Sequence, residues 1–419
     1  MSSALHHPPA ASRRLRRRLL GTSLLLLPLL RIPLPHGLLA ATLFLGTFAV
    51  VVVHGAAAIP TLAGAGHRLP VVLASGVAVA SGAAYGFHPS SQGVVVLLPA
   101  VLGALTASSV ATLSIGELRR YVAAPLLVAA AVQGAIVATQ WLTAAPVVLG
   151  LLTPGAALGE IDGFLRPQGT TSHVYEPAVL ALVAVGIVAA VGSAGGPRWA
   201  IGTGLVLASW AVAFSHSRSA LVGVATLAIV GIWAHRAGRR AVTGAVGVFL
   251  VGFLVGSLLS AGGWLVRVDH TATTDLDRAS LGRVTLLRQS LEITATSPLV
   301  GVGPANYRAV LETLPDYDPD LPYLVHDVPL AWAAELGVPA AVALAALLVV
   351  VVGRAVGGGP GTAAIVAASS GFFVFDKILY DRLFGTLLFG VSLGVLAVLA
   401  DRFAAEVPEG TGPTLDPTR

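Results

Sequence analysis

The chain has 419 residues, of which 55% are hydrophobic and only 11% are charged, whereas a soluble domain carries about 25% charged residues. So little polar surface excludes a water-soluble body of this size, and the absence of cysteine excludes disulfides and thiolate metal sites or nucleophiles. The net charge of +5 does not indicate nucleic-acid binding, because the basic residues lie in short loops beside apolar blocks rather than in one patch.

The apolar residues come in blocks of roughly 17 to 25, the length a helix needs to cross a bilayer. We therefore expect an all-α polytopic transmembrane helical bundle of about twelve spans. The expected spans are 19–34, 37–54, 69–86, 91–113, 121–141, 173–192, 197–214, 217–235, 240–260, 328–353, 361–376 and 383–401. The first is expected to be an uncleaved helix, because no small-residue cleavage site follows it.

The distribution of arginine predicts the orientation. Five arginines precede the first span, and most other short loops on the same side are also basic, as the positive-inside rule requires of cytoplasmic loops. We expect a multi-pass protein of the bacterial inner membrane. Its expected parts are a cytoplasmic basic N-terminus (1–18), spans one to nine (19–260), an extracytoplasmic loop (261–327), spans ten to twelve (328–401) and a cytoplasmic tail (402–419).

The long outer loop has the sequence of a folded segment. Residues 280–296 predict an amphipathic helix, in which Ser280 is a candidate cap and Leu281, Val284, Leu287 and Leu291 follow three- and four-residue spacing. We expect this helix to lie along the outer face of the membrane.

Three groups of polar residues in the outer segments are candidates for chemistry. The first is Ser215-His216-Ser217-Arg218-Ser219 at the end of a span. A guanidinium in that place is costly unless it is solvated or paired, and such residues commonly mark functional sites. The structural alternative is an arginine that reaches the outer headgroups.

The second group opens the amphipathic helix with Gly282-Arg283 and continues to Arg288. We expect Arg288 to pair with Glu292 four residues on, whereas Arg283 has no such partner on its own helix. The Gly-Val-Gly-Pro turn at 301–304 is not a nucleotide-binding loop, because no strand precedes it and no Lys-Ser/Thr follows.

The third group is Tyr323-Leu324-Val325-His326-Asp327, with Glu335-Leu336-Gly337 in the next span. Histidine is the side chain best suited to proton exchange near neutral pH. A single histidine at the membrane surface is, however, more often structural. Two long outer segments are expected, residues 142–172 and 261–327, and neither holds a set of His, Asp and Glu residues that could surround a metal ion. No metal and no cofactor are therefore expected.

The order of these groups resembles the O-antigen ligase and polymerase family. The resemblance covers about residues 160–345 and rests on Ser217–Ala220, Gly282-Arg283, Pro298–Pro304, His326-Asp327 and Glu335–Gly337, with Arg166-Pro167-Gln168-Gly169-Thr170 before the sixth span. It implies a metal-independent, inverting glycosyltransferase of the GT-C type. Such an enzyme moves a glycan from a polyprenyl diphosphate to an acceptor hydroxyl on the outer face of the membrane.

Carried over residue by residue, the resemblance implies a site in two parts. It places Arg218 and Arg283 on the diphosphate and His326 at the acceptor, as the catalytic residues. The residues expected to contribute to substrate binding are Arg166, Glu176, Arg288, Tyr323 and Asp327. The expected partners are the lipid-linked donor, a glycan or glycolipid acceptor, and membrane lipids.

The chain departs from the family pattern in three places. It has Asp327 where the family has Asn, Leu287 where the family has an aromatic residue, and Val174-Tyr175 where the family has Pro-Asn. The sequence leaves ligase and polymerase open, because both use the same leaving group. A transporter or flippase is the alternative from another class, but such proteins tend to show repeated halves and midplane polar sites. A structural scaffold would leave the outer arginines and histidine unexplained.

Overall fold

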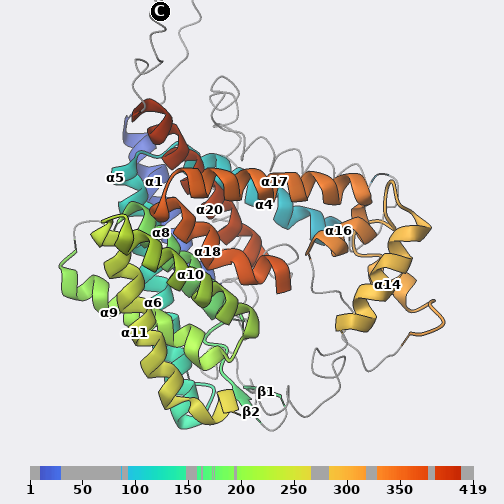
Figure 1. Ribbon diagram of the computed structural model, residues 1–419, viewed down its shortest axis with the longest axis horizontal. Coiled ribbons are helices and arrows are strands. Elements are labelled where there is room, and N and C mark those ends of the chain that lie inside the picture. The colour runs from blue at the N-terminus through green and yellow to red at the C-terminus, as the bar shows by residue number, and fades with distance from the viewer. Residues whose placement is uncertain are drawn as a thin grey trace, which may run out of the picture.

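A computed structural model describes most of the chain (Figure 1). The described residues are 10–29, 86, 93–147, 158–161, 164–171, 173, 175–192, 196–265, 283–317, 328–375 and 383–406. The spans expected at 37–54 and 69–86 lie outside them, apart from Gly86, as do Tyr323, His326 and Asp327.

The described part is almost entirely helical. In chain order its elements are α1 (Ala10–Leu26), the 3₁₀ turn η1 (Leu27–Leu29), α4 (Gly93–Ala111), α5 (Ile115–Leu118), the π-helical turn η2 (Arg119–Ala123), α6 (Ala124–Thr143), β1 (Gly159–Ile161), β2 (Phe164–Arg166), α8 (Glu176–Val191), α9 (Arg198–Ser215), α10 (Arg218–Arg236), α11 (Arg240–Leu259), α14 (Arg283–Thr296), α15 (Tyr307–Leu311), α16 (Val328–Leu336), α17 (Val338–Gly357), α18 (Pro360–Phe375) and α20 (Leu383–Glu406).

Four of the described helices are long and apolar enough to cross a membrane. They are the continuous helix Ile115–Thr143, α10, α11 and α17, and three shorter helices have apolar stretches at Leu98–Ala111, Glu176–Val191 and Phe384–Ala400. The expectation of an all-α membrane protein is confirmed at this level, and the count of twelve spans remains a prediction. Most expected boundaries lie within a few residues of the helices found.

One expectation about the elements is wrong, and two further features were not anticipated. The span expected at 328–353 is two helices, because Gly337 adopts φ +88° and ψ 161° between α16 and α17, a conformation almost confined to glycine. The first helix begins at Ala10, so the basic residues form its opening turns and not a separate tail. Between α6 and α8 the chain forms a short antiparallel hairpin, β1 with β2, that hydropathy does not indicate.

The bundle is built around α8. Fifteen of its sixteen side chains are buried, and α6, α9 and α18 pack against it. Neighbouring helices approach closely where one of them carries glycine, since a Cβ at Gly134 of α6 would lie 1.7 Å from the Leu207 carbonyl oxygen of α9. A Cβ at Gly371 of α18 would similarly lie 1.8 Å from the Ser219 oxygen of α10. Small residues at such contacts are typical of helices packed in membranes.

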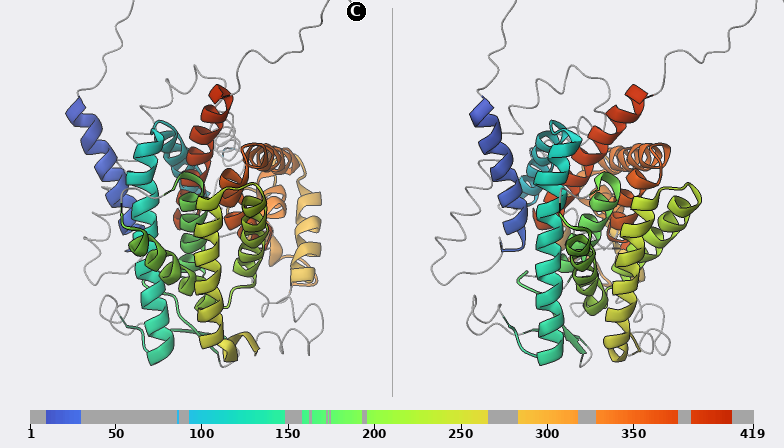
Figure 2. Two further views of the ribbon diagram at one scale, coloured as in Figure 1. Left: turned by 60° about the vertical axis from the view of Figure 1, so that its left-hand side comes forward. Right: turned by 90° about the vertical axis from the view of Figure 1, so that its left-hand side faces the viewer.

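The outer faces of the helices are apolar. On α17, Val342, Val349, Val352 and Val356 are all exposed and lie on one side of the helix, and Leu254 and Leu258 are exposed on α11. Exposed aliphatic stripes of this kind belong against lipid rather than water. Figure 2 shows α6 running the length of the bundle, with α1 and α20 near its upper end and the hairpin near its lower end.

The helices α14, α15 and α16 form a separate layer at one side of the bundle (Figure 1). A second apolar cluster holds this layer together, made of Leu286, Ile293, Tyr307, Leu311, Ala331 and Ala334. The predicted amphipathic helix is therefore present as α14. It packs on the protein through Leu286, Ser290 and Ile293, whereas the stripe of Val284, Leu287 and Leu291 is exposed.

Candidate functional site

Arg166 is the last residue of the hairpin, and its side chain is buried, with 2% of its surface exposed. The guanidinium carbon lies 4.7 Å from the centroid of the Tyr175 ring. Nη1 donates to the Tyr175 hydroxyl at 3.3 Å, and Nη2 donates to the Ser215 carbonyl at 3.2 Å. Within the described part of the chain, Nε has no hydrogen-bond partner. A buried cation with an unused donor is a group suited to an anionic ligand.

Two glutamines of α6 hold the loop that follows Arg166. Gln133 Nε2 donates to the Thr170 hydroxyl at 2.7 Å, and the Thr170 N–H donates back to Gln133 Oε1 at 2.9 Å. Gln140 binds Gly169 in the same reciprocal way, at 2.8 and 2.9 Å. The glutamines are seven residues apart and so lie on one face of the helix. They anchor the loop, and with it Arg166, to a rigid span.

The segment between α9 and α10 carries the first group predicted from the sequence. His216 adopts a left-handed conformation with φ +48°, and its ring is buried between Trp141 and Trp264, at centroid distances of 5.1 and 5.0 Å. Ser217 then caps α10, since its hydroxyl accepts from the Ala220 N–H at 3.2 Å. The histidine therefore has a structural role, because its ring packs between the ends of α6, α9 and α11.

Arg218 is the first residue of α10, and its side chain is half-buried. It lies three residues after Ser215, whose carbonyl binds Arg166, so the fold brings these two predicted arginines to the same end of the bundle. Glu176 is the first residue of α8 and is fully buried. It follows Tyr175, the ring on which Arg166 stacks, and its carboxylate is favourably placed at a helix N-terminus.

The second part of the site lies on the α14 layer. Arg283 is the first residue of α14, but its side chain is outside the described part. The expected pair of Arg288 with Glu292 is wrong, because the exposed Arg288 side chain pairs with Asp316 instead. A contact between α14 and the turn after α15 thus replaces a local helix pair. Arg288 is not brought together with Arg166 or Arg218 by any described contact.

The Gly-Val-Gly-Pro turn docks on the break between α16 and α17. The Val302 and Gly303 N–H groups donate to the carbonyls of Ala334 and Glu335, each at 2.9 Å, and the Val338 N–H donates to the Pro298 carbonyl at 2.8 Å. Two sequence motifs that lie thirty residues apart are therefore direct backbone partners. Their pairing fastens the α14 layer to the bundle.

A buried tyrosine stands at the centre of the α14 layer. The Tyr307 hydroxyl lies 2.6 Å from Ser290 Oγ, which also donates to the Leu286 carbonyl at 2.7 Å. Burial raises the pKa of Tyr307 above its usual range, the Ser290 contact lowers it, and Glu335 raises it further. The hydroxyl therefore keeps its proton at neutral pH.

The remaining predicted residues, Tyr323, His326 and Asp327, lie just before α16, outside the described part. Leu286 and Ala331 belong to one apolar cluster, and they lie about one turn inside α14 and α16 respectively. The helices that begin at Arg283 and just after His326 are thus packed together through their opening turns.

Sequence reasoning missed Gln133 and Gln140, and it named His216 without predicting its contacts. A signal was present for the glutamines, because amides are rare within spans and these two share one helix face. No sequence pattern predicted the packing role of His216, because that role depends on Trp141 and Trp264, which are distant in the sequence.

Comparison with known families gives one match. Residues 203–345, about a third of the chain, match a family model described as O-antigen ligase, and no curated protein matches the chain. The match runs from α9 into α17 and contains Arg218, Arg283 and His326, whereas Arg166 and Glu176 precede it. The resemblance expected from the sequence is therefore confirmed over this segment.

Proposed function

We propose that the chain, whose residues 203–345 match the O-antigen ligase family, transfers a glycan from a polyprenyl diphosphate carrier to an acceptor hydroxyl. The site faces the exterior of the inner membrane. The single observation that carries the proposal is the family match, and the position of Arg218 at the same end of the bundle as the buried Arg166 supports it.

The chemistry requires stabilisation of a leaving diphosphate. The acceptor oxygen bonds to the anomeric carbon with inversion as the bond from that carbon to the diphosphate oxygen breaks, and the polyprenyl diphosphate departs with the electron pair. Arg218 and Arg283 are assigned to the phosphates, because guanidinium forks match phosphate oxygens bidentately and need no reorganisation as charge develops. His326 is assigned to take the proton of the acceptor hydroxyl.

The buried residues near Arg218 support an anionic substrate at this end of the bundle. Arg166 has an unused Nε donor among the described residues and is held by two neutral groups, the Tyr175 ring and the Ser215 carbonyl. We assign Arg166 and Glu176 to the donor glycan or its phosphates, and Tyr323, Asp327 and Arg288 to substrate contacts on the α14 side. Ligase and polymerase differ only in the acceptor, which this assignment leaves open.

The two ends of α10 provide a matched test. Arg218→Ala is expected to remove most donor binding and turnover in protein reconstituted with a defined polyprenyl-diphosphate glycan. Arg236→Ala, at the exposed opposite end of the same helix, is expected to leave both near wild type. Arg218→Lys keeps the positive charge but loses the bidentate guanidinium geometry, so it should retain part of the donor binding and part of the turnover.

Donor affinity and turnover are to be measured separately for each variant. Equal loss in Arg218→Ala and Arg236→Ala would mean that general basicity, and not a phosphate site, binds the donor. Wild-type activity in Arg218→Ala would contradict the role given to this residue.

A further inference from the structure

A second basic site lies at the opposite end of the bundle from Arg166. A cavity of about 410 Å³ opens between α1 and the start of the helix Ile115–Thr143, and it is lined by Arg14, Arg17, Arg18, Ser114, Gly116, Glu117, Arg120 and Tyr121. Arg120 and Gln140 belong to that one helix and are twenty residues apart, which is about 30 Å at 1.5 Å per residue. The cavity is therefore one hydrocarbon thickness away from the loop that carries Arg166.

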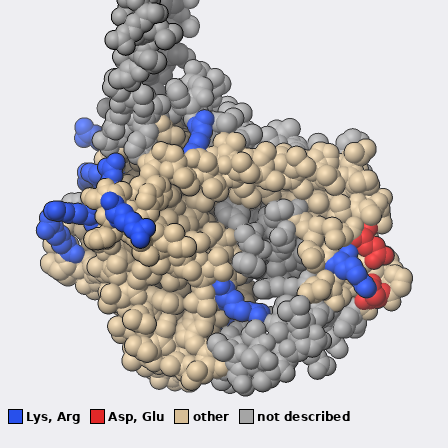
Figure 3. Space-filling view, viewed as in Figure 1, with Lys and Arg blue, Asp and Glu red and all other residues tan. Residues whose placement is uncertain are grey.

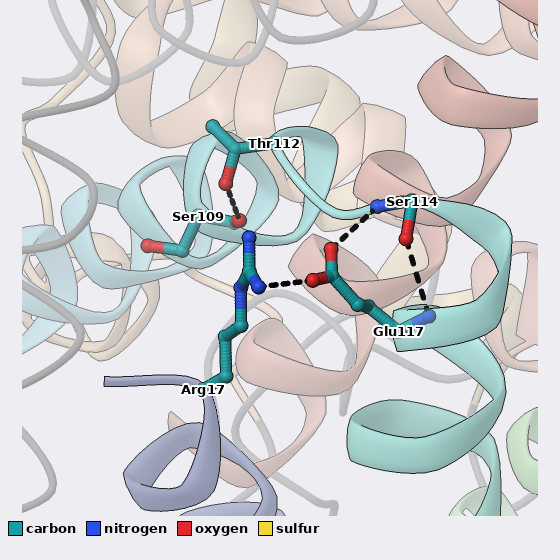
Figure 4. A network of polar contacts seen from close by, with 5 residues as sticks. All are labelled: Arg17, Ser109, Thr112, Ser114 and Glu117. Atoms are coloured by element: carbon teal, nitrogen blue, oxygen red, sulfur yellow. Dashed lines mark hydrogen bonds and ion pairs between the residues drawn. The ribbon is translucent and has the colours of Figure 1, made fainter. Parts of the chain in front are cut away.

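The charge of the cavity is only partly balanced. Four arginines and one glutamate line it, a net of three positive charges. The glutamate is already used, since Glu117 pairs with Arg17 and accepts from the Ser114 N–H at 2.9 Å (Figure 4). In the described part of the chain, Arg14, Arg18 and Arg120 form no ion pair. Figure 3 shows basic side chains gathered over this end of the molecule.

The Arg17–Glu117 pair explains how the cavity is built. It ties α1 to the capped first turn of α5, where Ser114 and Glu117 cap each other reciprocally. The guanidinium of Arg120 lies 5.6 Å from the centroid of the Tyr121 ring, on the π-helical turn that follows. Arg14, Arg18 and Arg120 line the same cavity, where their like charges repel one another and a bound anion would remove that repulsion.

The surroundings of the cavity favour a lipid over a soluble anion. Leu15 and Leu19 are 59% and 38% exposed, and each follows one of the cavity arginines, Arg14 and Arg18, along α1. An aliphatic surface thus adjoins the guanidinium groups, as a molecule with a charged head and an apolar tail requires. Basic pockets between helices at the cytoplasmic surface are suited to anionic headgroups, and tyrosine is favoured at that depth.

We propose that this cavity binds the phosphodiester headgroup of one anionic glycerophospholipid of the inner leaflet, with its acyl chains along Leu15 and Leu19. Nothing in this proposal depends on the transfer reaction at the other face. The occupant is a lipid, and a soluble phosphate compound is the outcome that would replace it.

The test uses the full chain in nanodiscs that contain phosphatidylcholine with a minor share of phosphatidylglycerol, followed by native mass spectrometry of the released protein. The pocket variant R14Q/R18Q/R120Q leaves the Arg17–Glu117 pair in place. The control R236Q/R239Q/R240Q changes the same number of charges on the same membrane side, at exposed positions in the turn between α10 and α11.

Wild type and control are expected to keep one phosphatidylglycerol, and the pocket variant should retain it at least about tenfold less, since each surface arginine contributes roughly a fivefold factor. The single variant R120Q, which leaves α1 intact, should show about that fivefold loss. Equal losses in pocket variant and control would overturn the proposal. Retention of phosphatidylcholine to the same degree, or displacement of the lipid by inorganic phosphate at millimolar concentration, would also overturn it.

Discussion

Arg166 shows how a cation is kept inside an apolar bundle. A buried guanidinium without partners would cost several kcal/mol, on the order of the penalty for an unpaired ion. Here the Tyr175 ring covers one face and the Ser215 carbonyl accepts from Nη2, so the charge is held without a carboxylate at any described contact. Among the described residues the charge therefore meets only neutral groups, an arrangement suited to a cation that binds an anionic ligand.

The position of Arg166 depends on Gln133 and Gln140, which together form a clamp on the loop that follows it. Gln133→Leu would leave the buried Thr170 N–H without an acceptor, which costs about 1–3 kcal/mol. It would also remove the bond from Gln133 to the Thr170 hydroxyl, which keeps its contact with the Pro28 carbonyl. We expect a lower melting temperature and reduced turnover. Thr139→Val, an exposed change on the same helix, is expected to stay within about 0.5 kcal/mol of wild type. Thermal melting in detergent checks both, and equal melting temperatures would contradict the clamp.

At the residue scale, charge was the informative signal. Arg218 was predicted because a guanidinium at the end of an apolar block is costly unless it is solvated or paired. Arg166 was predicted from the resemblance to the O-antigen ligase and polymerase family. The contacts of Gln133 and Gln140 were not predicted, because their partners lie in a loop 29 to 37 residues further along the chain and no pattern indicates which residues meet.

The break between α16 and α17 is the element on which the α14 layer depends. Gly337 has φ +88°, and a Cβ there would lie 2.3 Å from the Leu299 carbonyl oxygen. Gly301 faces the break from the other side, where a Cβ would lie 2.3 Å from the Glu335 carbonyl carbon. Both positions require glycine, because the backbone of the 299–301 turn lies directly against the backbone of residues 335–337.

Gly337→Ala is therefore expected to undock the layer. It combines a strained conformation with a backbone clash, so we expect a loss of more than about 2 kcal/mol. The matched change Gly353→Ala lies within α17 in open space and should be neutral or stabilising by about 0.5–1 kcal/mol. Thermal melting and limited proteolysis between α14 and α16 distinguish them. A Gly337→Ala protein as stable and protease-resistant as Gly353→Ala would contradict the docking.

At the element scale, hydropathy placed most helices but not this break. Residues 328–353 carry one charged side chain, Glu335, and are otherwise apolar, and a window average does not respond to one glycine. The amphipathic helix was predicted, whereas its buried face was not. The stripe of Val284, Leu287 and Leu291 is exposed, because α14 packs through a mixed face that contains Ser290. That face combines the apolar Leu286 and Ile293 with Ser290, whose hydroxyl is hydrogen-bonded to Tyr307.

At the scale of the whole molecule, two basic regions lie on opposite sides of an apolar belt. The Arg166 and Arg218 end is joined to the α1 end by α6 and its continuous extension. The orientation of this axis was predicted from arginine counts alone. The contact between the α14 layer and the bundle could not be predicted in the same way, because glycine is the only feature that the two contacting segments share in sequence.

Labelling of single cysteines tests the orientation, because the chain has none of its own. Thr313→Cys and Ala237→Cys are both at exposed positions, the first after α15 and the second between α10 and α11. An impermeant thiol reagent applied to intact cells with a permeable outer barrier should label the first and not the second. Both should react after the cells are lysed. The reverse pattern would invert the proposed orientation.

The central claim is transfer from a polyprenyl diphosphate, and release of that carrier is its most direct measurement. Purified protein in liposomes is given a defined polyprenyl-diphosphate glycan and an acceptor glycan in the presence of a chelator. We predict that free polyprenyl diphosphate and extended or ligated glycan appear in equal amounts, and that His326→Ala slows this release by roughly 10²–10⁴ while donor binding persists. Donor that crosses the bilayer with its diphosphate linkage intact, and no released carrier, would contradict the account and identify a transporter.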